Sequence, residues 1–399
     1  MSMITAKLGD ICTIYTGTGF PVQYQGESSG DYPFFKVGDI SKNVSKGHIY
    51  LTDCDNYISK EVAKKIKGTI VPVNTVVFAK IGEAVKLNRR AITSANCLVD
   101  NNAMGICPDQ TKILLPYFYH YMCSVKLEKF AEATTVPSVK KGVVEQLEIP
   151  LPSIDEQRVI SDTLDNIDDL VLLRKQQLSQ LEELVKSRFI ELFGSIPDSE
   201  HTTMTDVCSI ITDGTHQPPK FTSSGIPFLF VSNIVTNKIT YKTEKHISEE
   251  TYAELIKRTP IEIGDILLST VGSYGHPAVV ETDERFCFQR HIAYLKPKND
   301  VVNSRYLYGV LLSADVQKQI DEKVKGIAQK TLNLSEIKKL HFPLPPMELQ
   351  NEFAAFVEHT DKLKFTVRNT ITIYTALILY FTNFHWERRA SVSNKGVKP

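Results

Sequence analysis

Two pairs of adjacent carboxylates are the residues that first suggest acid–base chemistry. Asp168–Asp169 and Glu182–Glu183 would suit a general acid and base if they faced one site. Both pairs lie in a stretch with helical periodicity, and adjacent residues on a helix do not share a face. A solvated helix surface is therefore the better interpretation. Glu156 is expected in the first turn of this helix, where negative charge is favoured.

Motifs for binding nucleotides or transferring methyl groups are missing from the sequence. There is no G-x-x-x-x-G-K-[ST] phosphate loop, and the GTG at Gly17 does not continue as G-x-G-x-x-G. An Asn-Pro-Pro-aromatic methyltransferase motif is also absent, the nearest match being QPPK at Gln217. We therefore predict a chain that is not an enzyme and has no catalytic residue.

The seven cysteines include no C-x-x-C pair and have no histidines at zinc-ligand spacing. Cys12 and Cys208 lie in similar apolar contexts, as do Cys97 and Cys287. We expect buried free thiols and no metal site. The N-terminus lacks an apolar signal segment, and no run of about 18 apolar residues predicts a membrane span. These features favour a cytoplasmic protein.

A second group of candidates consists of cationic and hydrogen-bonding side chains at equivalent loop positions in the two halves of the chain. Such side chains reach the base edges of DNA, and Lys and Arg also contact phosphates. The candidates in the first half are Lys36, Lys80, Arg89, Arg90, Asn101, Lys140 and Lys141. Those in the second half are His216, Gln217, Lys220, Thr270, Arg290, His291, Gln329 and Lys330.

Each of these residues also has an ordinary surface or structural interpretation. Arg89–Arg90 and Lys140–Lys141 are the best candidates for phosphate contacts. His291 precedes the apolar IAYL and fits a structural histidine as well as a base contact. Asn101–Asn102 would equally form an Asx turn.

The overall charge limits how the chain could bind DNA. With 42% hydrophobic and 23% charged residues the composition is that of a globular protein, and the formal net charge is zero. No segment has a strong basic excess of the kind that DNA-binding domains usually carry. A DNA-binding role would therefore require a partner that supplies phosphate contacts.

The elements that position these candidates form a tandem duplication. GDICTIYTGTGFP at Gly9 resembles TDVCSIITDGTHQP at Thr205, and YPFFKVGDI at Tyr32 resembles IPFLFVSNI at Ile226. IPLPSIDEQ at Ile149 is repeated as FPLPPMELQ at Phe342. The period is too long for a solenoid, so it indicates a duplicated domain. Apolar runs such as VVFAKIG and ILLSTVG, which end at Gly, predict strands within an α+β fold with mixed or antiparallel sheets.

A long helix is predicted after each copy of the repeated phrase. Apolar residues recur at heptad spacing in the first helix at Ile160, Leu164, Ile167, Val171, Leu178, Leu181 and Val185. In the second they recur at Phe353, Val357, Ile371 and Ile378, with Thr360 and Lys364 as interruptions. Pro and Gly mark the ends of the first helix.

The expected architecture is two globular domains separated by two long antiparallel helices that form a coiled coil. Because domain termini often lie close together, the second helix should run back along the first. The predicted boundaries are residues 1–150 for the first domain, 151–195 for its helix, 196–346 for the second domain and 347–388 for its helix. Residues 389–399 are expected to be a disordered tail. The last stretch, VRNTITIYTALILYFTNFHWERRASVSNKGVKP from Val367, is apolar almost all round, which suggests either burial on several sides by packing on the first helix or a docking surface for a partner.

The whole chain resembles the DNA-specificity subunits of type I restriction–modification enzymes. The resemblance is carried by the two PLP phrases followed by long helices, and by TDGTHQPPKF, QRHIAYLKP and KGIAQKTLNLSEIKKLHFPLPP. It implies two target-recognition domains that each read one half of a gapped site on double-stranded DNA. It also implies that the helices space these domains and dock two methyltransferase subunits, through which a motor–nuclease subunit joins. S-adenosylmethionine would be bound by the methyltransferase partners, and this chain would hold no cofactor.

A coiled-coil scaffold that binds only proteins is the alternative function. The two functions can be distinguished by binding. A scaffold combined with its methyltransferase partners would show no sequence preference among gapped DNA sites.

Overall fold

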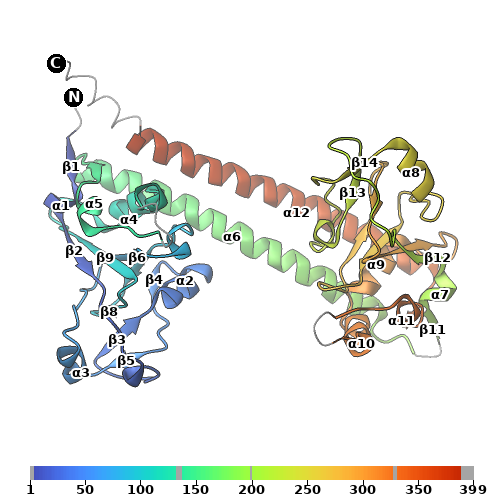
Figure 1. Ribbon diagram of the computed structural model, residues 1–399, viewed down its shortest axis with the longest axis horizontal. Coiled ribbons are helices and arrows are strands. Elements are labelled where there is room, and N and C mark those ends of the chain that lie inside the picture. The colour runs from blue at the N-terminus through green and yellow to red at the C-terminus, as the bar shows by residue number, and fades with distance from the viewer. Residues whose placement is uncertain (1–3, 132–136, 198–199, 327–329, 388–399) are drawn as a thin grey trace, which may run out of the picture. The chain divides into compact units, whose positions relative to one another are not determined.

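The computed structural model describes residues 4–131, 137–197, 200–326 and 330–387 (Figure 1). The chain divides into two compact units: Met1–Gln176 with Arg368–Pro399, and Gln177–Val367. Each unit holds one copy of the duplicated sequence and part of each of two long helices, α6 (Ile154–Phe193) and α12 (Met347–Thr382).

The first unit is built on a five-stranded sheet in the order β2-β9-β6-β7-β4, in which only β4 and β7 pair in parallel. A three-stranded sheet β5-β3-β8 and a two-stranded sheet β1-β10 complete it. The strands are β1 (Thr5–Lys7), β2 (Cys12–Thr16), β3 (Tyr32–Phe35), β4 (Tyr50–Leu51), β5 (Tyr57–Ile58), β6 (Val76–Ala79), β7 (Ala91–Thr93), β8 (Leu98–Val99), β9 (Ala103–Pro108) and β10 (Glu148–Pro150). The helices are α1 (Leu8–Ile11), α2 (Val37–Ser45), α3 (Lys60–Lys65), α4 (Leu115–Ser124) and α5 (Lys141–Glu145), with short 3-10 turns η1 (Val22–Tyr24), η2 (Glu83–Val85) and η3 (Leu127–Phe130).

The second unit repeats this topology except that its larger sheet, in the residues described, has no counterpart of β4. Its larger sheet has the order β12-β18-β15-β16, and it has a three-stranded sheet β14-β13-β17 and a pair β11-β19. Its strands are β11 (His201–Thr203), β12 (Cys208–Asp213), β13 (Ile226–Leu229), β14 (His246–Ile247), β15 (Ile266–Ser269), β16 (Pro277–Val279), β17 (Cys287–Phe288), β18 (Ile292–Pro297) and β19 (His341–Pro343). Its helices are α7 (Met204–Val207), α8 (Glu249–Leu255), α9 (Ser304–Leu312), α10 (Ala314–Lys323) and α11 (Leu334–Ile337), with a 3-10 turn η5 (Val231–Asn233). The parallel pair β13–β17 matches the parallel pair β3–β8, so the duplication inferred from sequence is also a structural duplication.

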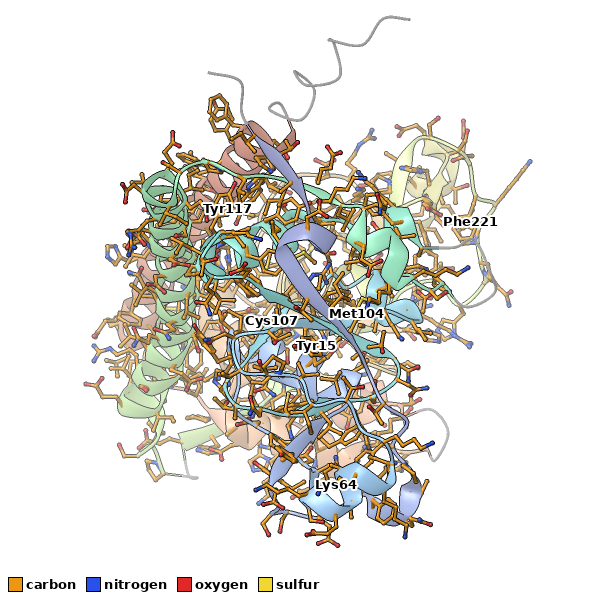
Figure 2. The ribbon with its side chains drawn as sticks, turned by 90° about the vertical axis from the view of Figure 1, so that its left-hand side faces the viewer. Tyr15, Lys64, Met104, Cys107, Tyr117 and Phe221 are labelled. Carbon is orange, nitrogen blue, oxygen red and sulfur yellow. The ribbon has the colours of Figure 1, made fainter. Side chains whose placement is uncertain are left out.

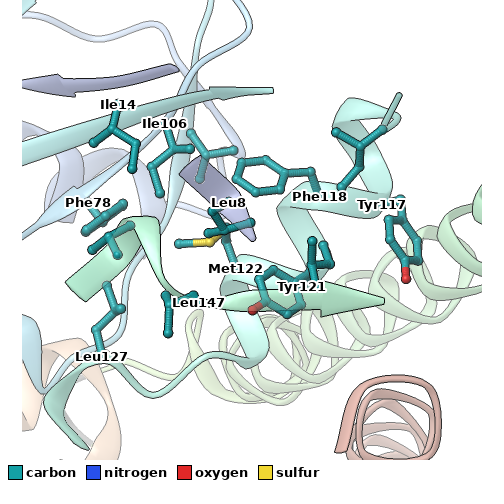
Figure 3. Packing of buried hydrophobic residues seen from close by; sticks show 14 of the residues in the cluster. Leu8, Ile14, Phe78, Ile106, Tyr117, Phe118, Tyr121, Met122, Leu127 and Leu147 are labelled. Carbon is teal, nitrogen blue, oxygen red and sulfur yellow. The ribbon is translucent and has the colours of Figure 1, made fainter. Parts of the chain in front are cut away.

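Buried apolar runs produce the central strands, as the sequence predicts. All four residues of β6 and all four of β15 are buried, because both faces of these strands are covered. In the first unit α4 covers one face, and Figure 3 shows Phe118 and Met122 of this helix among Leu8 and Ile106. In Figure 2, Tyr15, Met104 and Cys107 lie in the body of this domain, on the paired strands β2 and β9. The α+β fold with mixed, mostly antiparallel sheets is confirmed.

The predicted heptad residues lie on the less exposed stripe of the long helices. In the first unit Ile160 and Leu164 are buried in the domain core, together with the partly buried Ile378. In the second unit Phe353 and Val357 are buried with the partly buried Val185. The remaining predicted positions, Ile167, Val171, Leu178, Leu181 and Ile371, are partly buried.

Both interruptions of the seam in α12 have a local explanation. Thr360 is buried and its hydroxyl donates to the carbonyl of Phe356 at 2.9 Å, a bond that satisfies the hydroxyl within the helix. Lys364 is mostly buried along its stem and pairs with Asp361 at 3.3 Å. Asp361 also lies 3.6 Å from Arg305 of α9. Thr360 and Lys364 are therefore satisfied within α12, and Asp361 links the helix to α9.

The segments of α6 and α12 within the second unit run in opposite directions. Phe189 and Phe193, near the end of α6, pack on Phe353, near the start of α12, with ring centroids 5.4 and 5.6 Å apart. Arg188 and Glu352 form an ion pair at 2.5 Å beside them. In the first unit, the start of α6 shares its core with the end of α12 and with Trp386. The antiparallel pairing expected from the sequence is confirmed within each unit.

Three cysteines should be unreactive in the folded protein. Burial raises the pKa of the Cys97, Cys208 and Cys287 thiols to about 12 in each case. The thiolate fraction at pH 8 is then roughly one in ten thousand. We expect iodoacetamide at pH 8 to label these residues only after unfolding, which peptide mass spectrometry would measure. Labelling of any of the three at the rate of a free thiol would contradict the packing described here.

Among the described residues no group of three or more His, Cys, Asp or Glu side chains is arranged to hold a metal ion. Across the same ranges, no helix is long and apolar enough to cross a membrane.

Candidate nucleic-acid interface

A polar turn at the end of the first unit's central strands gathers several of the predicted residues. The turn joins β8 to β9 at Asp100–Asn102, and the Lys80 amide donates to the carbonyl of Asn102 at 2.8 Å. The amide of Asn102 donates to the Asp100 carboxylate at 2.9 Å, so the Asx turn foreseen for this segment is formed by Asp100. Asn101 is left exposed at the tip of the turn.

Lysines from two other segments lie beside this turn. The amide of Val139 donates to the carbonyl of Lys80 at 2.8 Å, which places the exposed Lys140 and Lys141 next to the end of β6. On the other side, the amide of Asp100 donates to the carbonyl of Phe35 at 3.0 Å, so Lys36 is adjacent as well. The structure therefore brings Lys36, Lys80, Asn101, Lys140 and Lys141 together around one turn; we call this set the first recognition turn.

The loop that follows β2 is fixed against the same turn by a glycine. The amide of Thr18 donates to the carbonyl of Val99 at 2.8 Å. A Cβ atom on Gly17 would lie 1.7 Å from the carbonyl oxygen of Asp100, so only glycine permits this approach. Further along the loop, Gln25 accepts from the Lys36 ammonium at 2.6 Å, and that ammonium lies 5.5 Å from the centre of the Phe20 ring.

The second unit has the same turn with different side chains. Here the turn joins β17 to β18 at Gln289–His291, and the Thr270 amide donates to the carbonyl of His291 at 2.9 Å. The amide of Gly272 donates to the carbonyl of Lys330 at 3.1 Å, which brings a lysine to the same end of the sheet. We call Arg290, His291 and Lys330 the second recognition turn.

The loop after β12 closes on this turn as its counterpart does. The amide of Arg290 donates to the carbonyl of Thr215 at 3.1 Å, and a Cβ on Gly214 would lie 2.2 Å from the carbonyl oxygen of Phe288. His216, Gln217 and Lys220 are exposed on this loop. The imidazole of His216 lies 2.9 Å from the carboxylate of Asp213, which also pairs with Arg258.

His291 has features both of a structural histidine and of a residue that could contact a base, the two interpretations given by the sequence. It is partly buried, and its Nε2 accepts a hydrogen bond from the Arg290 guanidinium at 3.3 Å. Partial burial and the neighbouring Arg290 charge lower the pKa of His291 below its usual value. A neutral imidazole with Nε2 as an acceptor fits this geometry. It orients Arg290, whose guanidinium remains exposed.

Two of the predicted residues have side chains that are buried in this structure. Arg90 is only 3% exposed, and its guanidinium donates to the carbonyls of Met122 and Val125 and stacks on Phe78. Thr270 is 5% exposed, so only its backbone takes part in the turn. Gln329 lies outside the described residues, and Arg89 is partly exposed ahead of β7.

Arg90 therefore serves stability, which a substitution pair can test. Burial lowers the pKa of its guanidinium to about 10, yet it stays charged at neutral pH because it faces backbone carbonyls. Arg90→Ala should lower the free energy of unfolding by about 2–4 kcal/mol, whereas Arg89→Ala should change it by less than about 0.5 kcal/mol. The fluorescence of Trp386, the only tryptophan, reports unfolding of this unit. Weaker DNA binding by Arg90→Ala with unchanged stability would contradict this assignment.

The joints between domains and long helices contain residues that the sequence analysis did not select. In the first joint Gln157 is fully buried, and in the second Gln350 is 1% exposed. Tyr117 donates to the carbonyl of Pro150 at 2.8 Å, and Tyr306 donates to the carbonyl of Pro343 at 2.5 Å. The sequence could have pointed to these residues, because both glutamines and both prolines lie in the repeated PLP phrases.

The comparison with protein families now decides the identity. The sequence model of the family described as "Type I restriction modification DNA specificity domain" matches residues 3–183 and 198–373. These ranges contain both recognition turns and most of both long helices. The chain belongs to this family.

Relatives and solved structures of the specificity-domain family cover nearly the whole chain. The type I restriction enzyme MjaVIII specificity subunit of Methanocaldococcus jannaschii is 22% identical over 385 residues, which are 90% of this chain and 85% of the relative. The EcoBI specificity subunit of Escherichia coli is 24% identical over 408 residues, 93% of this chain and 82% of the relative.

Two solved structures share the fold. The S subunit of a type I restriction–modification system from M. genitalium superposes with a TM-score of 0.54 at 14% identity over 96% of each chain. A chain from a study of complex assembly and conformational transition of the type I R-M system gives a TM-score of 0.60 at 17% identity, covering 96% of this chain and 97% of that one. The resemblance inferred from the sequence is therefore confirmed at the level of family and fold.

Proposed function

We propose that this chain is the DNA-specificity subunit of a type I restriction–modification complex and that each globular domain reads one half of a gapped, bipartite site. The observation that carries the proposal is the duplicated recognition turn, which has the same backbone and different side chains in the two units. Lys80 and Asn101 stand where the second unit has Thr270 and Arg290, and Lys140 stands where the second unit has Asn333. Unlike side chains on a common framework favour two half-sites that differ in sequence.

The side chains divide into two roles by their chemistry. Arg290 suits a bidentate contact with a guanine in the major groove, and Asn101 suits an adenine. Lys140, Lys141 and Lys330 suit phosphates, which fix the register without reading sequence. Since the net charge of the chain is zero, methyltransferase partners would supply most of the phosphate contacts.

The last turns of α12 and the π-helical turn η6 (Asn383–Glu387) that follows favour the docking of a partner. Ile373, Leu377, Tyr380 and Phe384 are exposed by 59%, 38%, 61% and 39%, at spacings of four, three and four residues. They form an apolar stripe distinct from the Ile378 and Phe381 side that packs in the core. Burial of this segment on several sides, one of the two outcomes foreseen, does not occur in the isolated chain. We assign the stripe to a methyltransferase subunit, with two such subunits per chain and a motor–nuclease subunit joining through them.

The chain would act without catalysing a reaction itself. The methyltransferase partners would bind S-adenosylmethionine and transfer the methyl group, and this chain would determine where on the DNA they do so. Genomic DNA in the cytoplasm would be the substrate of the assembled complex.

A binding assay with the reconstituted complex tests the proposal. The chain is combined with its methyltransferase partner subunits and offered duplexes that carry the candidate gapped site, each half-site alone, or a scrambled sequence. We expect binding at least about 1,000-fold tighter to the complete site than to scrambled DNA, the lower end of the range for specific readers. Equal affinity for all duplexes would contradict DNA reading and favour the scaffold function.

A further inference from the structure

One buried glutamine at each joint makes the same three hydrogen bonds. In the first unit, Oε1 of Gln157 accepts from the amide of Leu114 at 2.8 Å. Its Nε2 donates to the carbonyls of Lys112 at 3.1 Å and Pro152 at 3.0 Å. The side chain lies in the first turn of α6, so it joins the start of that helix to the segment leading into α4 and to the Pro-Leu-Pro segment.

The second unit reproduces this arrangement atom for atom. Oε1 of Gln350 accepts from the amide of Asn303 at 2.8 Å, and its Nε2 donates to the carbonyls of Val301 at 3.3 Å and Pro345 at 2.8 Å. Gln350 lies in the first turn of α12, and Asn303 caps α9. The two sets of partners occupy equivalent places in the duplicated sequence, although the residue types at Leu114 and Asn303 differ.

Only a glutamine side chain satisfies all three partners. The site offers one N–H and two carbonyl oxygens, which require one acceptor and two donor hydrogens on the same side chain. A glutamate would direct a carboxylate at two carbonyls, and an apolar residue would leave three buried backbone groups unpaired. The glutamine therefore fixes three backbone segments relative to one another at a point where prolines already restrict the chain.

We infer that Gln157 and Gln350 are positioning residues that fix the orientation of each recognition domain on its long helix, and thereby restrict the gap length that the complex accepts between half-sites. This inference rests on the proposed function. A rotation of about 10° at a joint displaces a point about 20 Å away by about 3.4 Å, which is the rise of one base pair. A small rotation of a domain at its joint would therefore move the recognition turn by about one base pair along the DNA.

The tyrosine that faces each joint provides a milder way to disturb the same place. Tyr306 donates its hydroxyl to the carbonyl of Pro343 and packs on Phe193, with ring centroids 4.9 Å apart. Removing the hydroxyl loosens the Pro-Leu-Pro segment while the ring and its packing remain. Tyr294 offers a control within the body of the second domain, where its hydroxyl faces the carbonyl of Pro260 at 2.7 Å and the carboxylate of Asp265 at 2.6 Å.

The test measures gap selectivity in the complete methyltransferase complex. The cognate site is first read from genomic methylation, and duplexes are then made with the native gap and with gaps one base pair shorter and longer. Methylation rates are compared for the unmodified chain and for Gln157→Met, Gln350→Met, Tyr306→Phe and Tyr294→Phe. We expect the ratio of native-gap to altered-gap rates to fall about tenfold for the two glutamine variants and about threefold for Tyr306→Phe. The ratio should be unchanged for Tyr294→Phe, and single-base preferences within each half-site should be unchanged in every variant.

Each outcome decides the inference. Unchanged gap ratios in folded glutamine variants, even with a lower melting temperature, would show a role in stability alone and overturn it. If the glutamine variants do not fold, equal ratios for Tyr306→Phe and Tyr294→Phe would overturn it. An unmodified complex that methylates all gap lengths equally would instead refute the proposed function, and the inference with it.

Discussion

Replacing Phe353 by alanine is expected to lower the free energy of unfolding of the second unit by about 3–5 kcal/mol. Phe353 is fully buried where α6, α9 and α12 meet, and its ring packs on Phe189 and Phe193. A Cβ on Gly309 of α9 would lie 2.7 Å from the same ring, so the space around it is filled. The surrounding side chains cannot easily fill the cavity that the truncation leaves. The loss in free energy of unfolding should therefore lie in the upper part of the range for such substitutions.

Phe365→Ala is the matched control for this substitution. Phe365 lies on the same helix and in the same unit, but it is 65% exposed. Its truncation should change the free energy of unfolding by less than about 0.5 kcal/mol. Calorimetry of the two variants measures the difference, and similar melting temperatures would contradict the packing assigned to the second joint.

Arg290→Ala is expected to reduce methylation of the cognate site by about 10- to 100-fold and to relax the preference at one base pair of one half-site. Arg290 is exposed at the tip of the second recognition turn, and its guanidinium is oriented by the imidazole of His291. The other half-site should be read unchanged, because Arg290 belongs to the second domain alone. Asn101→Ala should have the converse effect and relax the half-site read by the first domain.

Arg285→Ala removes the same charge from the same domain and serves as the control. Arg285 is exposed and is paired with Glu249 through two contacts of 2.8 Å. It precedes β17, whereas the turn follows that strand, so its loss should change neither rate nor base preference by more than about twofold. Methylation rates on a set of single-base variants of the site measure all three substitutions. Equal effects of Arg285→Ala and Arg290→Ala would indicate a general contribution of charge and no reading by the turn.

The architecture could be predicted from the sequence because the sequence contains two copies of the same domain followed by a long helix. Heptad spacing from Ile160 to Val185 and the repeated PLP phrases gave the helices, and α12 begins at Met347, where the second helix was expected. The flaws at Thr360 and Lys364 were harder to judge. The helix accommodates Thr360 because its hydroxyl donates to a backbone carbonyl, and Lys364 because it pairs with Asp361. Heptad spacing alone does not reveal these partners.

The candidate interface was predictable in part. Lys80, Asn101 and Lys140 come together because strand ends in a sheet meet at one edge, whereas nothing in the sequence distinguishes Arg89 from Arg90. The buried position of Arg90 follows from carbonyls contributed by Met122 and Val125, about thirty residues away along the chain. Long-range partners of this kind also explain why the glutamines at the joints were overlooked.

Domain exchange followed by methylome sequencing tests the central claim most directly. Residues 1–150 are replaced by the corresponding domain of another member of the family, and genomic methylation is sequenced in cells that carry the complex with the original or the exchanged chain. The account predicts that one half-site changes, while the other half-site and the gap between them stay the same. A change in both half-sites, or in neither, would contradict the claim that each domain reads its own half of the site.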